Sequence, residues 1–387
     1  MGRSAVEGMN LHSENQERKP RRIVVKVGTR LVVDAEGKPC RSFLDRLSGQ
    51  IREVMDDGIE VVLVTSGAVG IGRRMIFPTG RHLRPHERPS AAAVGQPLLM
   101  RYWARAMAQV DLTPAQVLLT QDDVVDRGRC MRLRETLEDL LGWGVLPVLN
   151  ENDSVSVESV TFGENDLLAA MVAVAITPAE LLIMLSDQDG LYTADPRLDP
   201  DADLICSVQP DQDVQRYASG AGGPESLGGM TKKIEAARRA TDCGIRVIIA
   251  GGHTPDILNR IVSGRETGTC LLPRRRLPSR KAWLAMHLMP AGTLTVDDGA
   301  REALMQPDGA SLLPSGIVSV AGDFQPGDIV TITDGPGNEI ARGIVNFSAR
   351  ETEEIMGEHS SRISALLGRK AAAAVIHRDD MVLTAGE

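Results

Sequence analysis

An apolar run followed at once by a turn of small residues constrains the fold of this chain more than any other feature. Ile59 to Val64 is a short β-branched run, which is typical of a parallel strand buried on both faces. The turn that follows, Thr65-Ser66-Gly67-Ala68, lies just beyond the carboxyl end of that strand. Because ligands of open α/β sheets bind outside the carboxyl ends of the strands, this turn is predicted to line a binding site.

A second strand precedes this one and completes a strand–helix–strand unit. Arg22 to Val27 is the predicted strand, an apolar stripe at helical spacing follows it within residues 42–57, and Gly58 ends the helix. Strands connected in this way are expected to be parallel. Lys26 interrupts the apolar run near its end, and an exposed edge position or a cation directed into the site explains it equally well.

Polar clusters follow two further predicted strands, 145–149 and 181–185. Asn150 to Asp153 follows the first strand, and Ser186 to Gly190 follows the second. Taken alone, the first cluster is more often a turn than a site. Four adjacent polar side chains are, however, costly to bury unless they meet water or a ligand.

A third polar cluster, Gly163 to Asp166, opens an apolar helix predicted at 167–176. Asn165 or Asp166 can simply cap that helix, because their side chains accept hydrogen bonds from its first free N–H groups. The cluster by itself therefore does not decide between a helix cap and a binding site.

A glycine-containing segment, 227–233, leads into a predicted helix at 234–243. Free N–H groups and the positive end of the helix dipole make such a helix start an anion site. A lysine there is unfavourable unless an anion is bound, so Lys232 or Lys233 is predicted to bind phosphate. The chain contains neither a Walker motif nor a Gly-x-Gly-x-x-Gly after its first strand, which excludes those two phosphate-binding classes.

The length of 387 residues suits two or three domains, and shifts in composition divide the chain into a leader and two domains joined by a linker. Residues 1–20 are polar and are predicted to be a flexible leader. The first domain spans 21–266, and the Pro- and Arg-rich residues 267–283 form a linker. Residues 284–387 carry short alternating runs between turn residues. The expected fold class is α/β, an open, mainly parallel sheet sandwiched by helices, with a small C-terminal domain that resembles a β-barrel.

Net charge and cysteine usage restrict the partners and the compartment. A formal charge of −9 argues against nucleic acid as a partner of the whole chain. The five cysteines form no Cys-x-x-Cys and no cluster with histidine, so reduced thiols in a cytoplasmic protein are expected and a zinc site is not. The longest apolar run, Leu167 to Ile176, is too short to cross a bilayer, and no membrane partner is expected.

Taken in chain order, the motifs of this sequence resemble those of the amino-acid kinase family, in members that carry a C-terminal PUA domain. The resemblance extends from about Arg22 to about Leu383 and is specific because of the order of the motifs. The motifs are Val-Val-Lys-Val-Gly-Thr (24–29), Val-Thr-Ser-Gly-Ala-Val (64–69), Ala-Ala-Val-Gly-Gln (92–96), Asn-Glu-Asn-Asp-Ser-Val (150–155), Glu-Asn-Asp (164–166), Ser-Asp-Gln-Asp-Gly-Leu-Tyr (186–192), Gly-Gly-Met-Thr-Lys-Lys (228–233), Ser-Leu-Leu-Pro-Ser-Gly-Ile (311–317) and Val-Ile-His-Arg-Asp-Asp-Met (375–381).

The resemblance implies an activity and its reactants. It implies transfer of the γ-phosphoryl group of ATP, with Mg²⁺, to the side-chain carboxylate of L-glutamate, the first step of proline biosynthesis. It also implies feedback inhibition by proline and a homo-oligomer. The residues agree with this chemistry, because the acceptor carboxylate is already a nucleophile and phosphoryl transfer then needs mainly alignment and cations.

By position, the resemblance assigns a role to residues of several motifs. Lys26 and Lys233 resemble the two lysines that flank the transferred phosphoryl group, and Asp166 resembles the aspartate that holds them. The positions similar to glutamate-binding ones are Ser66, Gly67, Asp153 and Asn165. The positions similar to ATP-binding ones are Lys26, Ser186, Asp187, Leu227, Gly228, Gly229, Met230, Thr231, Lys232 and Lys233.

Four positions depart from the family pattern. Ser226 and Leu227 stand where Gly-Thr is usual, and Lys232 stands where Thr is usual. The lost hydroxyl groups can weaken contacts to ATP, whereas Lys232 can act as a further cation. Glu164 replaces a common aspartate, which is a mild change.

The sequence is also compatible with two other functions, and it allows three interpretations of residues 73–89. A different amino-acid kinase, acting on N-acetylglutamate or aspartate, would share the fold, but Asp153 suits a free α-amino group that N-acetylglutamate lacks. An RNA-binding protein with a degenerate kinase domain is supported only by the basic residues within 274–280. The Arg- and His-rich segment 73–89 is a lid, an oligomer contact or, as favoured here, a solvated loop.

Overall fold

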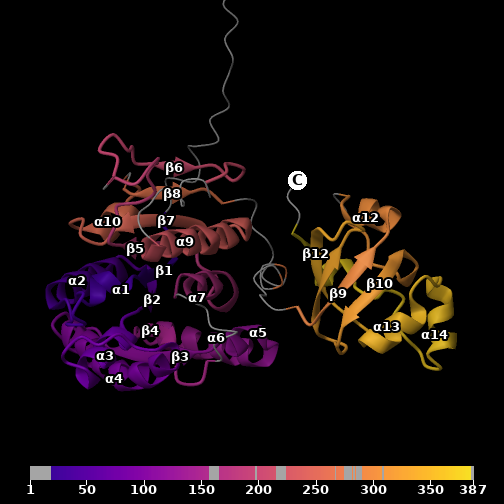
Figure 1. Cartoon of the computed structure of the whole chain (residues 1–387), viewed down its shortest axis with the longest axis horizontal. Helices are drawn as coiled ribbons and strands as arrows, with labels where there is room; N and C mark the ends of the chain where they lie inside the picture. Colours follow the sequence, from indigo (N-terminus) through magenta and orange to yellow (C-terminus); the bar gives the residue numbers. More distant parts are fainter. Residues whose placement is uncertain are drawn as a thin grey trace, which may run out of the picture. The chain divides into compact units, whose positions relative to one another are not determined.

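The computed structural model describes residues 19–384 except 157–164, 197, 215–223, 266, 274–280, 282–283, 285–289 and 307–308, and excludes the side chains of 121, 125 and 224–228. The chain forms two compact units, residues 1–274 and 275–387. Each unit contains its own sheet (Figure 1). Nearly all of the predicted leader, residues 1–18, lies outside the described residues.

An eight-stranded sheet organises the first unit, in the order β3-β4-β2-β1-β5-β7-β8-β6. Its neighbouring strands are parallel except for β7 and β8, which confirms the expected open, mainly parallel sheet. The strands are β1 (Arg22–Val27), β2 (Glu60–Val64), β3 (Pro114–Leu119), β4 (Leu146–Glu151), β5 (Leu181–Ser186), β6 (Ser207–Val208), β7 (Arg246–Gly251) and β8 (Thr269–Leu271).

Helices flank this sheet (Figure 1). They are α1 (Thr29–Val32), α2 (Arg41–Asp56), α3 (Ala68–Ile76), η1 (Pro85–Glu87), α4 (Arg88–Ala108), α5 (Gln121–Val125), α6 (Arg127–Gly142), α7 (Asn165–Met171), η2 (Val172–Ile176), α9 (Pro224–Asp242) and α10 (Ile257–Val262). Among the described residues, no helix combines the length and the apolar character needed to cross a membrane.

Strand β1 lies in the middle of the sheet, between β2 and β5, and its side chains alternate between the two faces. Ile23, Val25 and Val27 belong to the core that α2 and α4 cover. Lys26 therefore lies on the other face, where α7 contacts β1. The alternation places a lysine at the carboxyl end of a central strand, on the side of helix α7.

Helices α3 and α4 cross so closely that only glycine fits at the contact. A Cβ atom on Gly72 would lie 1.7 Å from the carbonyl oxygen of Ala91, and one on Gly95 would lie 1.8 Å from that of Ala68. Helix α3 begins directly after Gly67, which adopts a φ of 113° that favours glycine. The crossing of the two helices therefore fixes the turn that follows β2.

A five-stranded sheet organises the second unit, in the order β10-β9-β11-β12-β13. Strands β9 and β11 are parallel and the other pairs are antiparallel, around a core that includes Phe324 and Phe347. Its elements are β9 (Gly292–Val296), α12 (Asp298–Leu304), η3 (Pro314–Gly316), β10 (Ile317–Gly322), β11 (Ile329–Thr333), β12 (Glu339–Ile344), α13 (Ala349–Ile355), η4 (Ser360–Arg362), α14 (Ile363–Leu366), η5 (Arg378–Asp380) and β13 (Met381–Leu383).

The boundary between the units differs from the predicted one. Thr269–Leu271, which the sequence analysis assigns to the linker, forms β8 and pairs with both β7 and β6. The sheet therefore continues beyond residue 266, and the first compact unit extends to Arg274. Composition alone placed the linker too early because the three-residue strand is bordered by charged and proline-rich residues.

Candidate active site

A pocket of about 430 Å³ opens at the carboxyl ends of strands β4, β2, β1 and β5. Parallel strands bring together the segments that follow them, which explains why residues far apart in sequence meet there. The site residues predicted from the sequence that line it are Lys26, Ser66, Gly67, Asp153, Asn165, Ser186, Asp187, Gly229, Met230 and Lys233.

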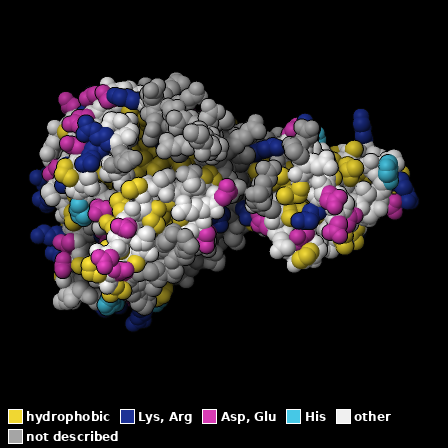
Figure 2. Space-filling model, turned by 90° about the horizontal axis from the view of Figure 1, so that it is seen from above, with side chains coloured by type: hydrophobic (Ala, Val, Ile, Leu, Met, Phe, Trp, Pro, Cys, Tyr) yellow, Lys and Arg dark blue, Asp and Glu magenta, His cyan; other side chains and the backbone are white. Residues whose placement is uncertain are grey.

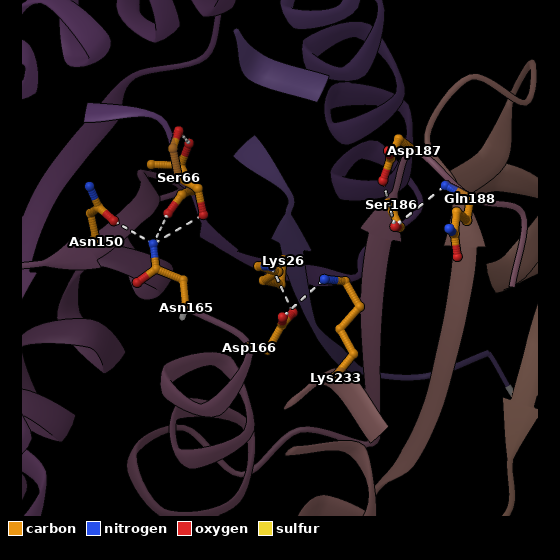
Figure 3. A network of polar contacts seen from close by, with 10 residues as sticks. Lys26, Ser66, Asn150, Asn165, Asp166, Ser186, Asp187, Gln188 and Lys233 are labelled. Atoms are coloured by element: carbon orange, nitrogen blue, oxygen red, sulfur yellow. Dashed lines mark hydrogen bonds and ion pairs between the residues drawn. The ribbon is translucent and has the colours of Figure 1, made fainter. Parts of the chain in front are cut away.

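Two lysines converge on one carboxylate at the middle of the pocket (Figure 3). Nζ of Lys26 lies 2.7 Å from Oδ1 of Asp166, and Nζ of Lys233 lies 3.1 Å from Oδ2. All three side chains are buried, with Asp166 only 1% exposed. Of the two explanations for Lys26, the geometry shows a cation directed into the pocket rather than an exposed edge residue.

Asp166 is held as an anion by these neighbours. Burial alone would raise the pKa of its carboxyl group, but the charges of Lys26 and Lys233 and the hydrogen bonds to them outweigh burial, so the pKa is lowered. A carboxylate that stays ionised between two ammonium groups is a poor proton acceptor. Its geometry suits the positioning of the lysines.

A chain of side-chain amides orders the turn after β2. Nδ2 of Asn165 lies 2.6 Å from the carbonyl oxygen of Thr65, 3.1 Å from Oγ of Ser66 and 2.6 Å from Oδ1 of Asn150. Nδ2 of Asn150 in turn donates to Oε1 of Gln96 over 2.7 Å. The chain orients each amide, and it leaves Oδ1 of Asn165 as an acceptor that does not take part in it.

Gln96 and Asn150 are not among the site residues predicted from the sequence. Both are buried, and Gln96 belongs to α4, which the sequence alone does not place against β4. The available signals were the Ala-Ala-Val-Gly-Gln motif and the polar cluster after β4. Neither signal reveals the hydrogen bond, because it joins residues 54 positions apart.

Asp153, which follows strand β4, and Arg88 both line the pocket. Burial raises the pKa of the Asp153 carboxyl group, and the nearby charge of Arg88 partly opposes that rise. Asp153 is one of the predicted site residues, whereas Arg88 belongs to a segment predicted to be a solvated loop. Arg88 is instead the first residue of α4, where it borders the cavity.

The opposite side of the pocket is built at the end of β5. Oγ of Ser186 lies 3.2 Å from Oδ1 of Asp187, and the backbone N–H of Gln188 donates to the same hydroxyl. Arg30 forms an ion pair of 2.9 Å with the other oxygen of Asp187. Burial raises the pKa of Asp187, but Arg30 outweighs it and the pKa is lowered. The sequence analysis did not name Arg30.

The predicted start of a helix near residue 234 is wrong. Helix α9 begins at Pro224, so Lys232 and Lys233 lie inside the helix and not before its first turn. The helix continues through the glycines because Met230, Ile234 and Ala237 pack one buried face. Lys233 nevertheless reaches the pocket, from the side of the helix.

Two predicted ATP-binding residues of α9 lie outside the described pocket lining. Thr231 and Lys232 are exposed on α9 and do not border the cavity. Of Leu227 and Gly228, only their place in α9 is described. Glu164, which replaces a common aspartate of the family, lies outside the described residues.

The fold and the site together define a kinase class. The chain belongs to the amino acid kinase family, whose family model matches residues 21–251, and a PUA domain model matches residues 292–367. The glutamate 5-kinases of Citrifermentans bemidjiense and Trichlorobacter lovleyi are each 43% identical to it, over 95% and 94% of this chain and 98% and 96% of theirs. The glutamate 5-kinase of Caldanaerobacter subterraneus subsp. tengcongensis is also 43% identical, over 94% of this chain and 97% of its own length. Within the family, the chain groups with the glutamate 5-kinases.

Proposed function

We propose that this chain transfers the γ-phosphoryl group of ATP to the side-chain carboxylate of L-glutamate, which gives L-glutamyl 5-phosphate in the first step of proline biosynthesis. The observation that carries the proposal is the convergence of Lys26 and Lys233 on one pocket, between an amide-rich side and the Ser186–Asp187 side. Relatives named glutamate 5-kinase that match nearly the full chain supply the substrate.

The reaction needs charge stabilisation more than proton transfer. The glutamate carboxylate is itself the nucleophile, and the transferred phosphoryl group carries spread negative charge in the transition state. In the proposed mechanism the ammonium groups of Lys26 and Lys233 meet that charge, and Asp166 holds them in place beforehand. Cations that are already oriented stabilise the transition state without a reorganisation cost.

The amide-rich side suits the acceptor amino acid. Oδ1 of Asn165 and the carboxylate of Asp153 are both acceptors, and an α-ammonium group is a donor with three N–H bonds. Ser66 and Gly67 lie at the turn between them and Lys26, and we propose that this turn seats the side chain of glutamate. An acylated nitrogen would place a bulky neutral group beside Asp153, which favours glutamate over N-acetylglutamate.

The opposite side suits the nucleotide. Ser186, Asp187, Gly229, Met230 and Lys233 line it, and we propose that they border the phosphates and ribose of ATP. Kinases use ATP with a divalent metal, here proposed to be Mg²⁺. Among the described residues no group of three or more His, Cys, Asp or Glu could hold a metal. Mg²⁺ keeps several waters and binds substrate phosphates, so it would arrive on ATP.

Proline as feedback inhibitor, a homo-oligomer and a cytoplasmic location stay predictions. RNA binding by the second unit is the less favoured function. In the face that Figure 2 displays, Lys and Arg side chains are intermixed with Asp and Glu rather than gathered in one basic area. Together with the net charge of −9, this arrangement offers little attraction for a phosphate backbone.

Trapping of the acyl phosphate with hydroxylamine tests the proposed function. The protein is incubated with ATP, Mg²⁺ and one acid at a time, and the hydroxamate is measured. We expect product with L-glutamate and little with N-acetylglutamate or aspartate. Equal or greater product with either of the other acids would overturn the substrate assignment, and no product with any acid would overturn the kinase activity itself.

A further inference from the structure

Arg88 is a pocket cation that the proposed mechanism does not use. It is the first residue of α4 and borders the cavity together with Asp153. Within the described part of the chain its guanidinium group takes part in no hydrogen bond or ion pair, although its charge is felt at Asp153. A guanidinium group at a pocket, without a hydrogen bond or ion pair in the described part of the chain, has its N–H donors available for a ligand.

The other cations of the pocket lining already have partners. Lys26 and Lys233 bind Asp166, and Arg30 binds Asp187 on the nucleotide side. Each of these side chains is placed where phosphate charge is expected. Arg88 is therefore the cation of the described lining that is left for a second anionic group of the acceptor.

The order of the strands separates the side of the pocket that holds Asp153 from the proposed nucleotide side. Asp153 follows β4, Lys26 ends β1 and Asp187 follows β5, and the sheet order is β4-β2-β1-β5. Helix α4 lies on the β4 side, because its Gln96 accepts a hydrogen bond from Asn150 at the end of β4, and Arg88 begins this helix and borders the cavity. Figure 3 shows Lys26 and Lys233 between Asn150 at the end of β4 and Ser186 at the end of β5.

An α-amino acid carries an ammonium group and a carboxylate on the same carbon atom. Asp153 and Arg88 offer the complementary charges on one wall of the pocket. We propose that Arg88 binds the α-carboxylate of the acceptor while Asp153 binds its α-ammonium group. The pair then selects an amino acid whose two α-groups are both free and charged, and it directs the side-chain carboxylate toward the lysines. This inference rests on the proposed function.

The test compares L-glutamate with its α-amide, which keeps the α-amino group and the side-chain carboxylate but has no charge at the α-carbonyl. Hydroxamate formation gives kcat and KM for both substrates. A charge-assisted hydrogen bond contributes enough to change affinity by about ten- to a hundredfold. In Arg88→Met we expect the KM for glutamate to rise by about that factor, with little change in kcat or in the KM for the α-amide. In Arg88→Lys, which keeps a positive charge, we expect the KM for glutamate to lie between those of the wild type and of Arg88→Met.

Arg101→Met is the matched control, because Arg101 is an exposed arginine of the same helix that does not border the cavity. It is expected to keep the wild-type preference for glutamate over the α-amide. If the α-amide is not phosphorylated, its inhibition constant against glutamate replaces its KM.

The outcomes separate this inference from the proposed function. A wild-type protein that phosphorylates glutamate, with an Arg88→Met variant that keeps the full preference for glutamate, overturns the role of Arg88 alone. An equal rise in the KM for glutamate and for the α-amide, or a rise in the KM for ATP instead, also overturns the role of Arg88. A wild-type protein that forms no glutamyl hydroxamate overturns the proposed function.

Discussion

Lys26 and Lys233 bind different oxygens of one carboxylate, at 2.7 and 3.1 Å, although strand β1 and helix α9 lie far apart in the chain. The shared partner, Asp166, lies in the first turn of α7. Three elements must therefore pack correctly before either ammonium group reaches its position. The two positive charges in the pocket are therefore positioned by the tertiary fold, and no single sequence motif supplies both of them.

Removal of either lysine is expected to abolish most of the activity. Lys26→Met and Lys233→Met should each lower kcat by about a hundred- to a thousandfold, the usual effect of losing one oriented charge donor. Hydroxamate formation from glutamate measures the loss, and circular dichroism verifies the fold. Near-normal turnover in either variant would contradict the assignment.

Lys232 offers a comparison within the same helix. It is exposed and does not border the pocket, whereas its neighbour Lys233 does. We expect Lys232→Met to change kcat and the KM for ATP by less than about threefold, because an exposed charge contributes little. A loss as large as that of Lys233→Met would show that ATP reaches Lys232, as the family resemblance implies.

Asp166→Asn is expected to destabilise the first unit in a pH-dependent way. Loss of the carboxylate leaves two buried ammonium groups without their partner, at a cost of about 3 kcal/mol. The pKa of Asp166 is lowered on folding, so its contribution is complete above the unfolded pKa of about 4 and is lost as the pH falls through the folded value.

Chemical denaturation of the wild type and of Asp166→Asn at a series of pH values measures that contribution. The difference in unfolding free energy should be constant from about pH 5 to 8 and should shrink below about pH 4. A difference that grows on acidification would mean that Asp166 is not the anion that the two lysines share.

The strands and the location of the site could be predicted because both depend on local patterns. The β-branched runs at β2 and β5 identify buried strands, and the polar residues after them identify the ends where a site forms. The orientation of Lys26 could not be decided, because alternation along β1 does not say which face α7 covers. That information comes only from packing.

Helix α9 shows a different limit of local patterns. Gly228 and Gly229 predict an interruption, since glycine is a poor helix former. In the structure, burial of Met230 and Ile234 on one face of the helix outweighs that preference. The contact between Gln96 and Asn150 was missed for a related reason, because it depends on how α4 lies against β4.

Gln96→Met tests whether the amide chain positions the substrate. The variant leaves Nδ2 of Asn150 buried without its acceptor, which should cost about 1–3 kcal/mol of stability. Because Asn150 also orients Asn165, we expect the KM for glutamate to rise about five- to tenfold, a loss within that same energy range, while the KM for ATP stays the same. A purely structural role of Gln96 would lower stability and leave the KM for glutamate unchanged.

The close crossing of α3 and α4 predicts that Gly95→Ala lowers the stability of the protein, whereas Gly49→Ala, the control, raises it. A Cβ atom on Gly95 would lie 1.8 Å from the carbonyl oxygen of Ala68, so Gly95→Ala must push the two helices apart. We expect a loss of more than about 3 kcal/mol, larger than ordinary overpacking because the obstructing atom belongs to the backbone. The shift would also displace Gly67, so activity should fall with stability.

Gly49→Ala is the control, because Gly49 lies inside α2 and a Cβ atom there would meet nothing within 4 Å. Alanine favours the helix over glycine, so this variant should be more stable by about 0.5–1 kcal/mol. Thermal unfolding of both variants measures the two effects. If Gly95→Ala unfolds at or above the wild-type temperature, the two helices cannot cross as closely as described, and the turn after β2 must be held in some other way.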